Sequence, residues 1–202
     1  MFKSSVLLII LIFLFTNSNA QTPVKLGIGV STNFSATNTG YQNAAKISLD
    51  FGNLRFEPFV AVVKSKQKRE PDPNSNNSFD TDSQQSLLLG SNFIFLVQNE
   101  KSHLYFGAGI GYEKITYSNE YKSGSSFGNY DYERSGLVLI PTIGGEYFLS
   151  SEFSFGVEIN YQILNLSGSS TETGNNQSTY RAKNTYEVST IGAYFTARYY
   201  LN

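Results

Sequence analysis

Apolar and polar side chains alternate with a period of two along most of this chain. In residues 104–113, for example, Leu104, Phe106 and Ile110 are separated by Tyr105 and by glycines. Such alternation gives a β-strand one apolar face, and no stretch repeats apolar residues at the helical spacing i, i+3, i+4, i+7. The pattern predicts eight strands, at residues 24–31, 45–52, 54–62, 87–97, 104–113, 136–147, 153–162 and 190–201.

The connections between these strands alternate between long and short. Long polar stretches lie near 35–43, 64–85, 118–133 and 167–185, whereas the other connections are confined to Gly52-Asn53, 98–102 and 150–152. In an up-and-down array, all the long connections then fall at one end. Short periplasmic turns and long extracellular loops are typical of outer-membrane barrels.

The N-terminal twenty residues have the pattern of a secretory signal. Lys3 precedes an unbroken apolar run at 6–15, and Ser18-Asn19-Ala20 supplies small residues for cleavage. A run this short falls below the roughly 20 residues of a spanning helix. We therefore expect a cleaved signal peptide at 1–20 and a single β-domain at 21–202, exported to the bacterial outer membrane. Gln21, not Cys, follows the predicted cut, which argues against a lipid anchor.

The fold class predicted is all-β: an eight-stranded antiparallel up-and-down transmembrane β-barrel. Closure leaves no sheet edge unpaired, as a bilayer requires. Aromatic residues on the apolar face near the short turns would form the girdle at one interface: Phe51, Phe56, Phe95, Phe106, Tyr147, Phe153, Phe155 and Tyr199. Tyr112, Tyr161 and Tyr186 would serve the other interface. A soluble secreted barrel, with this face turned inward around a small ligand, is the alternative.

Two segments carry a resemblance to a known family. Residues 139–158 (LIPTIGGEYFLSSEFSFGVE) and 104–112 (LYFGAGIGY) resemble the small outer-membrane β-barrel proteins, which include OmpX, the opacity proteins and the OmpA transmembrane domain. The resemblance extends in pattern over the whole chain after residue 20. It implies a barrel fold and insertion by the barrel assembly machinery, without specifying an activity.

Charged residues also occur on the face opposite the apolar one, which would line the lumen. They are Lys46, Asp50, Arg55, Glu57, Glu113, Glu146, Glu158 and Arg198. Eight strands leave a lumen that side chains fill, and an isolated buried charge is costly, so these groups should pair. We expect Glu146 and Glu158 to pair with Arg55 and Arg198 in a closed lumen. A narrow gated pore is the alternative, disfavoured by tyrosines on the same face.

A cluster of cations follows the third predicted strand. Lys64, Lys66 and Lys68 continue its outward phase beyond the last apolar residue. At that height they would meet the phosphates of outer-membrane lipid or lipopolysaccharide. The alternative is a solvated start of a loop.

Composition removes several classes of function. The chain has no cysteine, one histidine and a net charge of −1, which excludes thiol chemistry, cysteine-based metal sites and a basic nucleic-acid surface. His103 lies beside a short turn, at the end opposite the long loops, so we predict no enzyme activity. No dinucleotide cofactor is expected, because Gly107, Gly109 and Gly111 lack the G-x-G-x-x-G spacing. No metal is expected either, because the spacing of Asp72, Asp80 and Asp82 matches no calcium loop.

The long connections are rich in tyrosine, serine and asparagine. This composition is typical of adaptable binding loops. The tyrosines in or beside these connections are Tyr117, Tyr121, Tyr130, Tyr132 and Tyr180. We therefore expect surface recognition or adhesion, through a protein or glycan partner, with a purely structural envelope role as the other reading.

Overall fold

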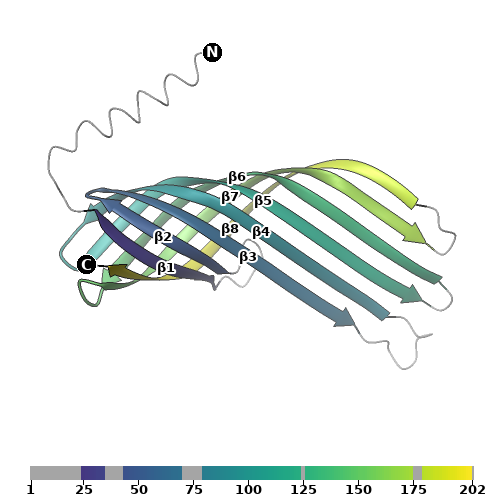
Figure 1. The fold of residues 1–202 in the computed structure, drawn as a ribbon, viewed down its shortest axis with the longest axis horizontal. Helices are drawn as coiled ribbons and strands as arrows, with labels where there is room; N and C mark the ends of the chain where they lie inside the picture. Colours follow the sequence, from purple (N-terminus) through teal and green to yellow (C-terminus); the bar gives the residue numbers. More distant parts are fainter. Residues whose placement is uncertain (1–23, 35–42, 70–78, 124–125, 175–178, 202) are drawn as a thin grey trace, which may run out of the picture.

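The computed structural model describes residues 24–34, 43–69, 79–123, 126–174 and 179–201. Eight antiparallel strands close into one barrel in which each strand pairs with its neighbours in sequence and β1 pairs with β8 (Figure 1). The strands are β1 (Lys25–Asn33), β2 (Asn43–Phe51), β3 (Leu54–Arg69), β4 (Phe79–Gln98), β5 (Ser102–Ser123), β6 (Ser126–Phe148), β7 (Phe153–Gly174) and β8 (Thr179–Leu201). The predicted fold class is confirmed. The expected signal peptide lies outside the described residues.

The wall of the barrel has the two faces that the alternation predicts, with the apolar face outside. On β7, residues from Ser154 to Leu166 alternate between buried and exposed along nearly the whole length. Large apolar side chains stand exposed on the outer surface, among them Leu104, Ile143 and Phe155, each at least half exposed. The soluble alternative required this face to line the interior, so that alternative is wrong.

The outward apolar positions form a continuous band around the barrel, here called the belt. On the six longer strands it covers residues 54–62, 87–97, 104–112, 137–147, 153–163 and 191–201, and on β1 and β2 residues 26–30 and 45–51. Each longer strand therefore contributes 9 to 11 residues to the belt. A tilted strand needs about 9–11 residues to cross the hydrocarbon of a bilayer.

Three short turns join strands at the end of the barrel that also holds both ends of the described chain, here called the near end (Figure 1). Gly52 adopts a positive φ of 64° in the two-residue turn between β2 and β3, a conformation that glycine adopts without steric cost. Asn99 and Ser102 bond to each other across the second turn, and Leu149 donates to Phe153 across the third. The predicted short turns are confirmed.

The long polar stretches differ from the prediction. Residues 64–69, 79–85, 118–123, 126–133, 167–174 and 179–185 are strand, not loop. These residues extend β3 to β8 beyond the belt, by about ten residues on β5 to β8, or roughly 20 Å along the barrel axis. We call these parts of β3 to β8 the extension. Residues 35–42 lie outside the described part of the chain.

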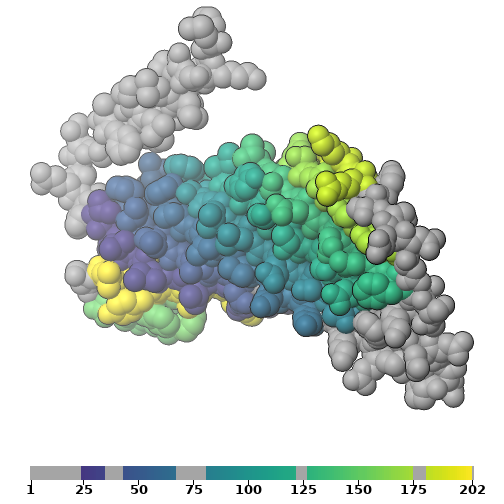
Figure 2. Space-filling view, turned by 45° about the vertical axis from the view of Figure 1, so that its right-hand side comes forward, coloured from purple at the N-terminus to yellow at the C-terminus, as the bar shows by residue number. Residues whose placement is uncertain are grey.

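Among the described residues, the extension is an open sheet and not a closed barrel. On β3, the residues after Val62 pair only with β4. On β8, the residues that precede Tyr194 pair only with β7. In these described segments, the wall has a gap above the shorter β1 and β2. Figure 2 shows the blue-purple β1–β2 region confined to one end while the green and yellow strands continue to the other.

No helix long and apolar enough to cross a membrane is found in the part of the chain that the structure describes.

Candidate functional site

All eight predicted lumen charges point into the barrel. Lys46 and Asp50 come from β2, Arg55 and Glu57 from β3, and the remaining four from β5, β6, β7 and β8. Their exposed fractions lie between 0% and 8%. The period of two places them there, because each occupies the phase opposite to the belt.

Glu146 lies at the centre of one half of this network. Its carboxylate accepts hydrogen bonds from Arg55 Nη2 at 2.7 Å and Arg198 Nη1 at 3.0 Å. His103 Nδ1 lies 3.1 Å from Glu146 Oε1, and Ser154 donates to the same carboxylate. Arg55 also binds Asp50 through two nitrogens, at 2.6 and 2.8 Å, a bidentate geometry that fixes its orientation.

The other half joins Lys46 and Arg198 through two carboxylates. Lys46 Nζ lies 2.9 Å from Glu158 Oε1 and 3.3 Å from Glu57 Oε2. Arg198 reaches Glu57 at 2.9 Å through Nε and Glu158 at 3.7 Å through Nη2. Each of these buried ions thus faces at least one opposite charge, the condition under which burial is tolerated.

Parts of the expected pairing differ from what the structure shows. Glu146 meets both arginines, and Glu158 meets Arg198. The shortest ion pair of Glu158 is with Lys46, however, while Arg55 pairs with Asp50 and Glu146. Glu113 faces inward at the upper end of the lumen, several residues along β5 from the level of the arginines, and Ser86 is its hydrogen-bond donor.

The network has two further members: His103, which we did not expect there, and Tyr200, one of the tyrosines expected on the lumen face. His103 contacts Glu146 and packs against the Phe148 ring at 4.6 Å, although we expected a residue of the rim. Tyr200 Oη accepts a hydrogen bond from Arg55 at 2.6 Å. Both share the inward phase of their strands, and that phase was the available signal. Among the connected described residues, three cations face four carboxylates.

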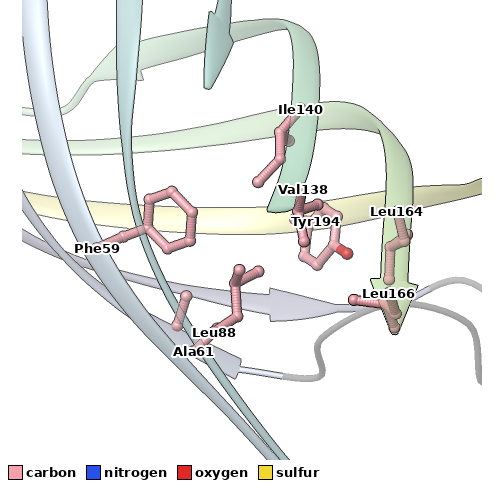
Figure 3. Packing of buried hydrophobic residues seen from close by; sticks show 9 residues of the cluster. Phe59, Ala61, Leu88, Val138, Ile140, Leu164, Leu166 and Tyr194 are labelled. Carbon is pink, nitrogen blue, oxygen red and sulfur yellow. The ribbon is translucent and has the colours of Figure 1, made fainter. Parts of the chain in front are cut away.

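An apolar layer closes the lumen on the side of the network toward the extension. Figure 3 shows its side chains pointing toward one another from different strands: Phe59, Ala61, Leu88, Val138, Ile140, Leu164, Leu166 and Tyr194. Each is at most 8% exposed. Tyr105, Ile94 and Leu96 form a second buried cluster. These little-exposed side chains fill the described part of the lumen at two levels.

The tyrosines expected in loops lie on strands of the extension. Tyr117 of β5 stacks on Tyr132 of β6 at 4.8 Å between ring centres, and Tyr130 meets both rings edge-on. Tyr121 is also exposed on β5, in the same phase as Tyr117. The side chain of Tyr180 lies outside the described residues. Burial raises the pKa of the Tyr132 phenol above its ordinary value, so this hydroxyl stays protonated at physiological pH.

Tyr186 lies on the inner side, not on the outer surface where we expected it. The centre of its ring lies 3.5 Å from the guanidinium carbon of Arg134, and the same carbon lies over the Tyr132 ring at 4.1 Å. Arg134 extends from β6 across β7 to reach this ring on β8. At that level β7 carries Gly168, in register with both Arg134 and Asn184. The other two expected members of the set, Tyr112 and Tyr161, are exposed on the outer surface.

The predicted girdle residues all lie on the half of the belt toward the near end. Phe51, Phe95, Phe106, Tyr147, Phe155 and Tyr199 are exposed, and Phe56 and Phe153 are partly buried. Rings from adjacent strands contact each other, for example Phe95 and Phe106 at 5.4 Å.

The predicted lysine cluster lies where the belt ends on β3. Lys64 and Lys66 are exposed and continue the outward phase of Val62. Lys68 belongs to β3, but its side chain lies outside the described residues.

No group of acidic or histidine side chains suited to hold a metal ion occurs within the described ranges.

Comparison with solved structures identifies the architecture. A major outer membrane protein of Thermus thermophilus superposes with a TM-score of 0.62 at 9% identity, over 89% of this chain and 100% of that one. The chain shares its fold with a bacterial outer membrane protein. Acinetobacter baumannii CarO2 and CarO give TM-scores of 0.49 and 0.47 at 8% identity, over 89% and 91% of this chain and 100% of each. No protein-family model and no curated protein sequence matches.

Proposed function

We propose that this protein is an integral outer-membrane β-barrel with a closed lumen that acts at the cell surface through its extension. The belt supports the membrane location, because its 9 to 11 residues on each of the six longer strands match the hydrocarbon thickness. Aromatic side chains at its near end suit an interface with lipid head groups. The near end then faces the periplasm, and the extension projects outside the cell.

The observation that carries the surface role is the extension itself. A barrel that only stiffened the membrane would need no more than the belt and short connections. Here six strands continue beyond the belt and hold tyrosines and an arginine on their inner face. Tyrosine supplies a large, rigid contact area at little conformational cost, which favours recognition of a glycan or protein partner.

Shortening the extension tests this role. Tyr117 and Tyr132 are in register, so residues 118–131 can be replaced by an Asn-Gly turn that keeps the hairpin pairing. Cells displaying the full-length protein should attach to mucin-coated wells about tenfold more than cells displaying the shortened form, because many weak contacts add together. Equal attachment of both forms would contradict the surface role.

The closed lumen makes a separate prediction. Purified protein reconstituted into planar lipid bilayers should produce no discrete conductance steps, since the charge network and the apolar layer fill the lumen. A porin prepared in the same detergent is the positive control. Steps whose ion selectivity changes in an Arg198→Gln variant would establish the gated-pore alternative instead.

The lysines at the end of the belt support a lipid contact. Lys64 and Lys66 stand at the height of the outer-leaflet head groups in this orientation, and each cation contributes about 1 kcal/mol against an anionic surface. We propose the phosphates of lipopolysaccharide as their partners. Insertion by the barrel assembly machinery and a cleaved signal peptide complete the proposed route to the membrane.

A further inference from the structure

Arg134 is held in an unusual position for a cation on a protein surface. Its guanidinium carbon lies over two tyrosine rings, 4.1 Å from the centre of the Tyr132 ring and 3.5 Å from the centre of the Tyr186 ring. Stacking of this kind restrains the plane of the group but uses none of its hydrogen bonds. The five N–H donors lie in that plane and point outward from its edge.

These donors have no acceptor among the described residues. The acidic groups nearest in sequence have other partners: Glu133 faces the outer surface and pairs with Lys114 at 2.8 Å. Asp131 accepts from Asn129, also on the outer side. On the inner side, Asp82 accepts from Tyr117 and Asn119. The inner face thus presents an oriented cation with its donors available.

The surroundings of Arg134 are flat, aromatic and hydrophilic. Rings of Tyr117 and Tyr130 continue the surface along the extension, and Asn119, Ser170 and Asn184 add amide and hydroxyl groups. In the described part of the chain, no strand pairs with the free edges of β3 and β8 at this height, and Tyr186 is 41% exposed. Such a surface suits a flat, hydroxyl-rich ligand better than a hydrophobic side chain.

We infer that the inner face of the extension binds a carboxylate-bearing saccharide chain, with Arg134 as the residue that binds the carboxylate. Sugar rings present C–H groups that suit the electron-rich faces of tyrosine, and their hydroxyls suit the nearby amides. A planar guanidinium held over aromatic rings can bind a carboxylate edge-on, through two parallel hydrogen bonds. The inference rests on the proposed surface function and names the ligand class of the same extension.

The test compares one acidic polymer with its neutral form. Full-length protein in detergent is titrated calorimetrically with polygalacturonate and with fully methyl-esterified polygalacturonate, which has the same sugar ring without the charge. We expect the acid to bind at least about tenfold more tightly than the ester, as a charge-assisted bidentate pair provides. Arg134→Gln should abolish this preference.

Lys183→Gln is the matched control. Lys183 is an exposed cation on β8, next in sequence to Asn184 but pointing to the outer surface. Its replacement removes the same charge at the same height and should leave the preference for the acid unchanged. Folding of both variants is checked by the shift in gel mobility on boiling, and the comparison of acid with ester in the wild-type protein does not depend on any variant.

Three outcomes would overturn the inference. These are no binding of either polymer, equal binding of acid and ester, and equal losses in the Arg134 and Lys183 variants. If the acid fails to bind while attachment to mucin still depends on residues 118–131, the saccharide inference alone is wrong. If attachment is also independent of those residues, the proposed surface function fails with it.

Discussion

Replacing Glu146 with glutamine should lower the free energy of unfolding of the barrel by about 3–5 kcal/mol. The carboxylate of Glu146 is fully buried and is shared by Arg55 and Arg198, which are also buried. A neutral amide leaves both guanidiniums with less compensating charge in a site that water cannot reach. Reversible urea unfolding of the protein in phospholipid vesicles measures the change.

Glu133→Gln is the matched control for that substitution. Glu133 pairs with Lys114 at 2.8 Å, a distance similar to those in the lumen, but the two side chains are 60% and 50% exposed. An exposed pair contributes about 1 kcal/mol or less. Similar losses for Glu146→Gln and Glu133→Gln would contradict the view that the buried network stabilises the closed lumen.

A cation placed in the middle of the belt should also have a large effect. Ile159 points outward from β7, half-way along its belt segment, and is 49% exposed. In a bilayer this position lies near the midplane, where Arg costs about 2–4 kcal/mol on a barrel surface. Ile159→Arg should therefore destabilise the protein by that amount in vesicles, measured by the same urea unfolding.

The position of the membrane predicts that this cost depends on depth. Asn165 has the same outward phase on β7 but lies just beyond the belt. Asn165→Arg should cost about 0–1 kcal/mol, as expected near an interface. If both arginines cost the same, the belt is not the membrane-spanning surface and the proposed location is wrong.

These experiments separate two sources of stability in one wall. The outward face needs an apolar solvent, while the inward face needs its charges satisfied within the protein. Each strand serves both needs through alternate residues. Within the lumen, glycine leaves space for large inward side chains. At Gly144, a Cβ would lie 2.5 Å from the Tyr105 ring, so the absence of a side chain makes room for that tyrosine.

The sequence by itself determined the faces of the strands and the end that carries the short turns. Belt and lumen differ sharply in polarity, so a period of two is visible wherever a strand lies between them. Hence the alternation alone was enough to assign Ile143 and Leu104 to the outer surface and Arg198 to the lumen. The same reasoning failed beyond the belt. Both faces of the extension meet water, so the period disappears and its strands resembled polar loops.

Only the tertiary structure decided which lumen charges meet. Lys46 and Glu158 are 112 residues apart, and their contact depends on the register of every strand pair between them and on the tilt that closure imposes. A shift of register would bring different charges to the same level. The sequence also left open that Arg134 crosses β7 to stack on Tyr186, because that contact joins strands that are not neighbours in the sheet. Local alternation specifies the direction in which a side chain points, and the closed barrel determines what it meets.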